Sequence, residues 1–273
     1  MKILVLQIED RDDKFLNKLM KSNKNICQNN DIQYVFYKKS NQHVPPYWAK
    51  VYEIKKIMDQ GIDVDYILWV DSDAFFINFN KERILSFLKK YEKYSFIGTP
   101  DMPPWTEKFN AGVFFIKNNQ IGKEMVNKWV TYYHKDVWNY DDKTSKWSTN
   151  ATWAGEEYEQ GSFSKYIMQD QNFAKHIIMI PYYYLNNNNC EDHLDESLLV
   201  HLAGDYKKND NNIKTCSKKL ILDDVVEGFN NISRMPNILN IIMILLIIIF
   251  IFLVFLLYKK NNLGSIKIKM KSK

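Results

Sequence analysis

The chain has few cysteines, and their spacing excludes two common uses of this residue. Cys27, Cys190 and Cys216 lie far apart in the sequence, and no CxxC pair occurs. Zinc fingers and thioredoxin-like motifs both need such a pair, so both are excluded. We therefore expect all three thiols to be reduced and inert.

The globular part of the chain also lacks an excess of basic residues. The net charge is +5 over 273 residues, but the last fifteen residues contain six lysines and no acidic residue. Without these six charges, residues 1–258 have a net charge of −1. We therefore expect no nucleic-acid-binding domain.

A membrane anchor is expected near the C-terminus. Residues 238–258 form an apolar run that only Asn240 interrupts. At ~1.5 Å per residue, such a run spans ~30 Å, the thickness of the hydrocarbon core of a bilayer. The pattern predicts a globular domain over 1–222 and three segments after it: a stem over 223–236, a transmembrane helix over 237–258 and a basic tail over 259–273.

The orientation of this anchor rests on two opposing signals. The N-terminal stretch MKILVLQIEDRDD has only four consecutive apolar residues before Gln7, too few for a signal peptide. The missing signal favours a domain that faces the cytosol. The six lysines after the span would also prefer the cytosol, or would rest on anionic headgroups. We expect a cytosolic-facing domain.

The globular part has an α/β pattern. Hydrophobic residues make up 46% of the chain, enough for a packed core. Expected strands cover residues 2–8, 32–38, 65–70, 94–101, 109–118, 176–181 and 197–204, and expected helices cover 12–30, 46–61, 80–93 and 121–138. This alternation predicts an αβα sandwich with a mostly parallel sheet, in which ligands bind beyond the carboxyl ends of the strands. The Trp-rich residues 134–162 are expected to form a substrate loop, and the asparagine run at 186–189 is expected to pad a loop.

Two carboxylates stand at one of these strand ends. Asp71 and Asp73 directly follow the apolar stretch YILWV. In an extended segment, side chains at i and i+2 point to the same side, so the two can converge. A divalent cation such as Mg²⁺ or Mn²⁺, bound to substrate phosphates, would remove the repulsion between them.

Two enzyme classes use such a pair. Phosphatases of the haloacid dehalogenase type take a nucleophile and an acid from a DxD, and Asp223-Asp224 could supply their distal metal ligands. Their DxD normally ends the first strand, whereas this one ends the third expected strand. Nucleotide-sugar transferases instead use DxD to hold a metal against a diphosphate.

The neighbouring residues favour the second class. Five stretches occur in order over residues 45–207: PYWAKVYEIKKIM, DYILWVDSDAFFIN, FNAGVFFIKNNQIGKEMVNKWV, YEQGSF and VHLAG. They resemble the GT-A-fold family of fungal α-galactosyl- and α-mannosyltransferases and plant xyloglucan xylosyltransferases, with similar proteins in giant viruses. The glycogenin and lipopolysaccharide galactosyltransferase family is a more distant resemblance. Neither includes the C-terminal anchor, since cellular relatives usually carry theirs at the N-terminus.

The resemblance implies a metal site. Asp73 matches a direct metal ligand, Asp71 a residue shared between the metal and the nucleotide ribose, and His201 the distant third ligand. An imidazole beside carboxylates favours Mn²⁺ over Mg²⁺. A lysine five or six residues after the histidine neutralises the leaving phosphate, and Lys207 fits that place, with Lys208 as the alternative.

Further positions match the donor site of the family. Gly204 would let the backbone approach the diphosphate. Lys50 matches a basic residue that points at the donor, and Asn110 and Ala111 match a strand edge that lines the sugar pocket. The resemblance therefore implies a donor site assembled from distant parts of the chain.

One pair of residues should lie near the anomeric carbon of the donor. Glu159 and Gln160 match an acidic residue and glutamine of the family, and Asp170-Gln171 is a rival pair. We prefer Glu159-Gln160, because its distance from the strand at 176–181 leaves room for a helix, whereas Asp170-Gln171 would cap one. Three tryptophans could stack on sugar faces or belong to the core: Trp105, Trp147 and Trp153.

The resemblance thus implies a metal-dependent glycosyltransferase that acts with retention. The expected donor is a nucleoside diphosphate sugar, with UDP favoured over GDP, and the acceptor is a glycan or glycoprotein. Its catalytic residues would be Glu159, Gln160 and Lys207. The alternative outside the enzymes is an inactive, membrane-anchored scaffold.

Overall fold

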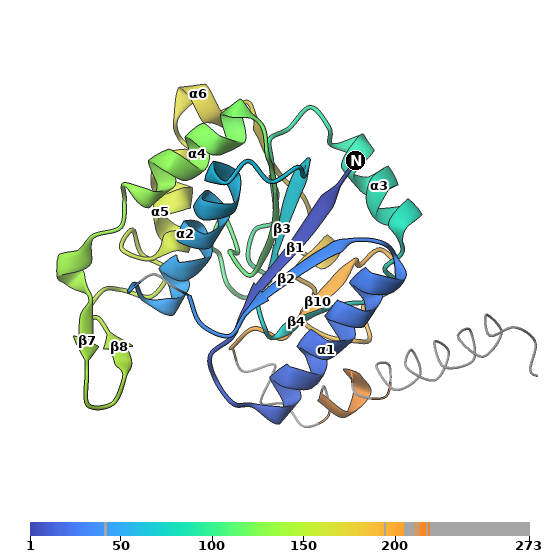
Figure 1. Cartoon of the computed structure of the whole chain (residues 1–273), viewed down its shortest axis with the longest axis horizontal. Helices are drawn as coiled ribbons and strands as arrows, with labels where there is room; N and C mark the ends of the chain where they lie inside the picture. Colours follow the sequence, from blue (N-terminus) through green and yellow to red (C-terminus); the bar gives the residue numbers. More distant parts are fainter. Residues whose placement is uncertain (41–42, 194, 205–210, 212, 217, 219–273) are drawn as a thin grey trace, which may run out of the picture. The chain divides into compact units, whose positions relative to one another are not determined.

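The central sheet is built from the apolar stretches at residues 2–8, 32–38 and 65–70 and the strands that follow them. A computed structural model of the protein describes residues 1–40, 43–193, 195–204, 211, 213–216 and 218. Six of its strands form this sheet in the order β2-β1-β3-β6-β5-β9: β1 (Ile3–Ile8), β2 (Gln33–Tyr37), β3 (Tyr66–Val70), β5 (Phe96–Gly98), β6 (Val113–Lys117) and β9 (Ile177–Met179). Figure 1 shows β2, β1 and β3 side by side. All are parallel except β6, which runs antiparallel to β3 and β5. The predicted mostly parallel α/β sheet is confirmed.

Helices cover both faces of this sheet. The four longer ones are α1 (Lys14–Asn29), α2 (Pro46–Asp59), α3 (Lys81–Lys90) and α4 (Gln120–Val130). Successive β3 side chains alternate between two hydrophobic clusters. Ile67 and Trp69 pack with α2 and α4, whereas Leu68 and Val70 pack with the face that carries α3. Because both faces are buried, β3 is apolar without interruption, and polar side chains begin only where it ends.

Local sequence explains where the helices begin. The side chain of Asp13 accepts hydrogen bonds from the backbone N–H groups of Phe15 and Leu16, at 2.8 and 3.0 Å. Asn80 and Asn119 cap α3 and α4 in the same way. Helix α2 begins instead at Pro46, where the missing N–H of proline costs nothing.

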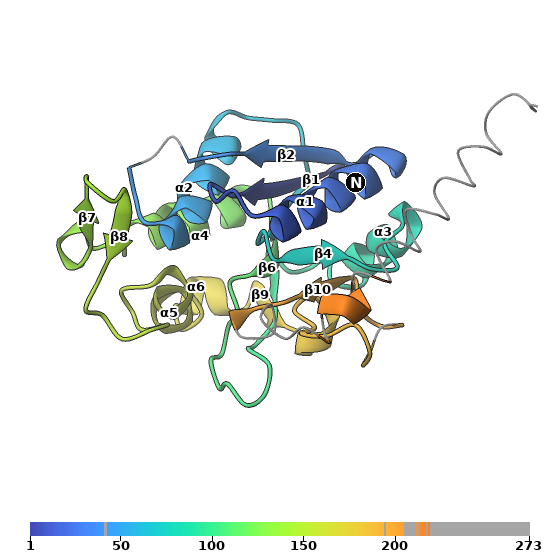
Figure 2. The ribbon, with the colours of Figure 1, turned by 90° about the horizontal axis from the view of Figure 1, so that it is seen from below.

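A second, two-stranded sheet departs from the prediction. Strand β10 (Leu199–His201) pairs antiparallel with β4 (Ala74–Phe76), a strand directly after the DxD that the sequence did not predict (Figure 2). The expected strand at 197–204 is therefore real but lies outside the central sheet. Its register places His201 opposite Ala74, one residue from Asp73.

The region between α4 and β9 is less regular than predicted. The expected helix 121–138 ends as α4 at Val130, and a 3-10 turn, η1 (Lys135–Val137), follows it. The expected substrate loop contains a hairpin of β7 (Asn139–Asp141) and β8 (Lys146–Ser148). The expected helix before β9 is three short pieces: α5 (Glu159–Ser162), a π-helical turn η2 (Phe163–Ile167) and α6 (Gln171–Ala174). A last 3-10 turn, η3 (Tyr182–Tyr184), follows β9.

The predicted stem, transmembrane helix and basic tail at 223–236, 237–258 and 259–273 lie outside the described residues. The same holds for Asp223-Asp224, Lys207 and Lys208. Among the residues that are described, no helix combines the length and the apolar character needed to cross a bilayer.

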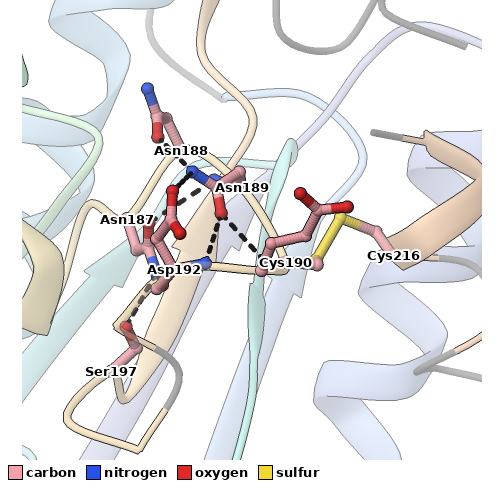
Figure 3. Close-up of a disulfide and its surroundings, with 8 residues drawn as sticks. Asn187, Asn188, Asn189, Cys190, Asp192, Ser197 and Cys216 are labelled. Carbon is pink, nitrogen blue, oxygen red and sulfur yellow. Dashed lines mark hydrogen bonds between the residues drawn. A yellow bond between two sulfur atoms is a disulfide. The ribbon is translucent and has the colours of Figure 1, made fainter. Parts of the chain in front are cut away.

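The asparagine run at 186–189 is not padding. Asn186 and Asn187 are almost fully buried. The side chain of Asn187 donates to Ser197 Oγ at 2.9 Å (Figure 3). Asn187 also forms a β-bridge with Val200 of β10. The run therefore holds the second sheet in place.

Next to this run, Cys190 is bonded to Cys216 (Figure 3). The expectation of three reduced thiols is therefore wrong for this pair and right for Cys27, which is free and buried. The two partners are 26 residues apart in sequence, and spacing alone does not identify such a pair. Because disulfides persist mainly in oxidising compartments, the redox state of this pair in cells would test the prediction of a cytosolic-facing domain.

We expect reduction of the Cys190–Cys216 bond to lower the free energy of unfolding by about 3.5 kcal/mol. The reason is that the unfolded chain gains conformational entropy when a loop of this length is no longer closed. Urea unfolding with and without dithiothreitol measures the change. The variant with both Cys190→Ser and Cys216→Ser should unfold at the same urea concentration as the reduced wild type, and dithiothreitol should not change its midpoint. A wild-type midpoint that the reductant leaves unchanged would contradict the stabilising role.

Candidate functional site

The two carboxylates lie in a tight turn at the carboxyl end of β3. The backbone N–H of Ala74 donates to the carbonyl oxygen of Asp71 at 3.0 Å, which closes the turn. The N–H of Asp71 donates to the carbonyl oxygen of Gly112 at 2.8 Å, which ties the turn to the start of β6. The segment is thus a turn and not the extended stretch that was expected, but the two side chains still converge.

His201 completes a group of three potential metal ligands. Its Nε2 atom lies 3.2 Å from Asp73 Oδ1 and 3.9 Å from Asp71 Oδ2. One ligand atom from each residue can be chosen so that all three lie within 4.8 Å of one another. The pairing of β4 with β10 is what brings His201 to the DxD.

The ring of His201 is oriented by Asn186. The side-chain amide nitrogen of Asn186 donates to Thr99 Oγ1 at 2.7 Å and to the carbonyl oxygen of Val113 at 3.1 Å. With both of its protons used, the amide faces His201 Nδ1 through its oxygen, at 2.8 Å. Nδ1 therefore donates to Asn186, and Nε2 is the ring nitrogen directed toward the carboxylates, from where it could bind a metal ion after losing its proton.

Gly112 makes room for this ring. A Cβ atom at this position would lie 1.9 Å from His201 Cε1 and 2.5 Å from Nδ1. No side chain fits there while the ring stays in place. The glycine of the FNAG stretch was not singled out from the sequence, although the stretch itself was.

Electrostatics couple the three residues. Burial lowers the pKa of His201, but its hydrogen bond to Asp73 and the charges of Asp73 and Asp71 outweigh burial and raise that pKa above its ordinary value. Two carboxylates and an imidazole nitrogen form a donor set that suits Mn²⁺ and also accepts Mg²⁺. The residues present therefore fit a divalent metal ion.

Lys50 occupies the other side of Asp71. Its ammonium group is buried and lies 3.1 Å from Asp71 Oδ1, 3.2 Å from Glu159 Oε1 and 2.9 Å from the carbonyl oxygen of Ala111. Burial lowers the pKa of Lys50, but the two carboxylates outweigh it and raise that pKa. These three acceptors match its three protons, so Lys50 holds Asp71 in place. The contact of Lys50 with the donor, which the resemblance implies, stays a prediction. Trp69 Nε1 also donates to Asp71 Oδ1, at 2.7 Å, which leaves Oδ2 toward His201.

The predicted sugar-pocket residues meet at the same place. The backbone N–H of Ala111 donates to Gln160 Oε1 at 2.9 Å. Asn110 is buried, and its side chain bridges Asp101 Oδ1 and the N–H of Gly112, each at 2.8 Å. The structure thus brings Gln160 and Ala111 together, and it uses the Asn110 amide to support the turn before β6.

The rival pair lies elsewhere. Asp170 accepts from the N–H of Asn172 as the cap of α6 and forms an ion pair with Lys128. Asp170 is thus a helix cap, as was predicted from the sequence for this pair. It caps the first turn of a helix. Glu159, in contrast, is buried against Lys50 in the site.

The remaining predicted positions are dispersed. Gly204 has φ +58°, a left-handed conformation that favours glycine, and it lies next to Trp105. Trp147 packs against His43 in the hairpin region. Trp153 is 62% exposed.

Part of the chain is similar in sequence to known glycosyltransferases. Residues 3–94, with Lys50, Asp71 and Asp73, match the model of the galactosyl transferase GMA12/MNN10 family. "Probable glycosyltransferase 7" of Oryza sativa subsp. indica is 28% identical over 125 residues, 43% of this chain and 27% of the relative. "Probable xyloglucan 6-xylosyltransferase 3" of Arabidopsis thaliana is also 28% identical over 125 residues, 43% of this chain and 26% of the relative. The chain thus spans about a quarter of the length of these curated relatives.

A solved structure extends the comparison to the fold. The crystal structure of "a glycosyltransferase involved in the glycosylation of the major capsid of PBCV-1" is similar with a TM-score of 0.58 and 17% identity, over 78% of this chain and 100% of that one. The described residues therefore have a glycosyltransferase fold. The predicted resemblance to the galactosyl transferase family is confirmed over residues 3–94.

Proposed function

We propose that this protein is a metal-dependent glycosyltransferase that moves a sugar from a nucleoside diphosphate sugar to a hydroxyl group of a glycan or glycoprotein. The observation that carries the proposal is the group of Asp71, Asp73 and His201 at the carboxyl end of β3. It lies where α/β sheets bind ligands, on a fold shared with glycosyltransferases.

We assign different roles to the residues of the site. Asp71, Asp73 and His201 would hold Mn²⁺ or Mg²⁺, which supplies positive charge to stabilise the leaving diphosphate. Asn186 keeps Nε2 of His201 aimed at the carboxylates. Lys207 would add a second positive charge to the leaving group.

We place the sugar next to Ala111 and Gln160. Transfer with retention would form the bond from the acceptor oxygen to the anomeric carbon on the face from which the diphosphate leaves. The acceptor proton would pass to the departing phosphate oxygen. Gln160 Oε1, held by the N–H of Ala111, would stabilise positive charge on the opposite face of the sugar. Glu159 contributes through its buried ion pair with Lys50.

Nucleotide binding tests this function directly. With Mn²⁺ present, UDP or GDP at about 100 times its Kd should stabilise the wild type by about 2.7 kcal/mol, or roughly 5–10 °C in Tm. Asp73→Ala should lose this shift and the Mn²⁺-dependent hydrolysis of sugar nucleotides, because it removes a ligand oxygen. Asp63→Ala, which removes an exposed carboxylate paired with Lys2, is the matched control and should behave as wild type.

Other outcomes identify the alternatives. Full activity of Asp73→Ala would reject the proposed metal site. No stabilisation by any nucleotide would favour an inactive scaffold, and phosphatase activity without nucleotide would favour the dehalogenase class. The cytosolic orientation and the anchor at 237–258 remain proposals, which protease protection of membranes can test.

A further inference from the structure

Four aromatic side chains form a cluster beside the site: Tyr47, Trp138, Trp153 and Tyr158. The ring of Tyr47 lies 5.4 Å from that of Trp153 and 5.1 Å from that of Tyr158, and Trp153 lies 5.0 Å from Tyr158. Trp138 and Tyr158 are buried, whereas Tyr47 is 37% and Trp153 62% exposed. Two buried rings thus support two exposed ones.

This aromatic cluster is continuous with the site. Tyr47 lies in the first turn of α2, three residues before Lys50 and on the same side of the helix. Tyr158 directly precedes Glu159, the partner of Lys50. Trp48 Nε1 donates a hydrogen bond to the carbonyl oxygen of Glu157 at 2.9 Å, which connects α2 to the segment that precedes Tyr158.

The charged residues of the site act electrostatically on Tyr47. The pKa of the Tyr47 hydroxyl is raised mainly by burial, and the charges of Glu159, Lys50 and Asp71 also act on it. Asp71 separates the two regions, since its Oδ1 contacts Lys50 and its Oδ2 faces His201. The cluster therefore lies on the Lys50 side of Asp71, and His201 lies on the other side.

We propose that the exposed rings of Tyr47 and Trp153 bind the acceptor as a neutral saccharide. The inference rests on the proposed function and adds the place and class of the acceptor. The four rings carry no charge, and the nearby Lys50 is already paired with Glu159 and Asp71. The exposed surface therefore offers flat apolar area and the phenolic hydroxyl of Tyr47. Such a surface suits the C–H face of a sugar ring, and an anionic ligand would find no unpaired cation in the cluster.

A comparison of two activities tests the proposal. A screen of neutral α- and β-linked oligomers of glucose, galactose and mannose identifies one that accepts sugar from the donor. With that oligosaccharide, Trp153→Ala should raise the acceptor KM roughly tenfold, while donor hydrolysis without acceptor stays within about twofold of wild type. Trp153→Phe should recover most of the acceptor affinity. Phe36→Ala, which removes a ring of 40% exposure on β2, is the matched control and should change neither activity.

The other outcomes are informative. An unchanged acceptor KM in Trp153→Ala would overturn the proposal, as would a wild type that hydrolyses the donor but transfers to none of these oligosaccharides. Equal loss of donor hydrolysis and nucleotide affinity would assign the rings to the donor or its base. The proposed function fails separately, if no nucleotide binds with Mn²⁺.

Discussion

Lys50→Met should destabilise the protein by about 3–5 kcal/mol, one of the two largest effects we expect of a single substitution. The change leaves the carboxylate of Glu159 buried without its cation, and the loss of one partner from a buried ion pair has this cost. Tm should fall by roughly 10 °C for a domain of this size. Thermal and urea unfolding without nucleotide or metal measure the effect.

Two further variants separate this cause from a general effect on α2. Lys55→Met removes a lysine of the same helix that is paired with Asp59 near the surface, and its cost should stay below about 1 kcal/mol. In a Glu159→Gln background, Lys50→Met should cost less than about 2 kcal/mol, since no buried charge is left without a partner. If Lys50→Met is as stable as wild type and only weakens donor binding, Lys50 contacts the donor, as the resemblance alone implied.

The parts of the fold that follow from local patterns could be predicted. Strands β1 and β3 and helix α1 were expected because each has a clear apolar period and, for the helix, a cap at Asp13. Strand β4 was missed because the turn before it is formed by the DxD itself, so that its three residues look in the sequence like a continuation of that motif and not like a new strand. The short helices after Tyr158 were missed because the break at Met168–Asp170 contains neither glycine nor proline.

The residues of the site that belong to recognisable motifs could be predicted from the sequence. Asp71, Asp73 and His201 are chemically distinctive at the ends of apolar stretches, and the structure brings them together. Asn186 was not found, because an asparagine in a run of four is also typical of a loop. Its role depends on contacts with Thr99 and Val113, which lie 87 and 73 residues away and which only the folded chain establishes.

Gly112→Ala should lower the affinity for Mn²⁺ at least 100-fold, as much as His201→Ala. The backbone of Gly112 does not need a positive φ, so alanine is allowed by conformation and excluded only by the His201 ring. With a Cβ 1.9 Å from its Cε1 atom, the ring must leave its place between Asn186 and Asp73. The loss should exceed the 10- to 100-fold that is typical when a residue behind a ligand is changed, because here the ligand itself is displaced.

A double variant distinguishes the displacement of His201 from a general loss of stability as the cause of weaker Mn²⁺ binding. Forcing a methyl group into a packed core costs about 1–3 kcal/mol, so Gly112→Ala alone should also lower Tm. Removing the ring in the Gly112→Ala, His201→Ala pair should recover that stability, because the new methyl group then fits, but Mn²⁺ affinity should stay low. Electron paramagnetic resonance of free Mn²⁺, titrated with protein in the presence of UDP, measures the affinity independently of turnover. Wild-type affinity in Gly112→Ala would mean that His201 can bind from another position, and that the packing of the ring on Gly112 does not define the metal site.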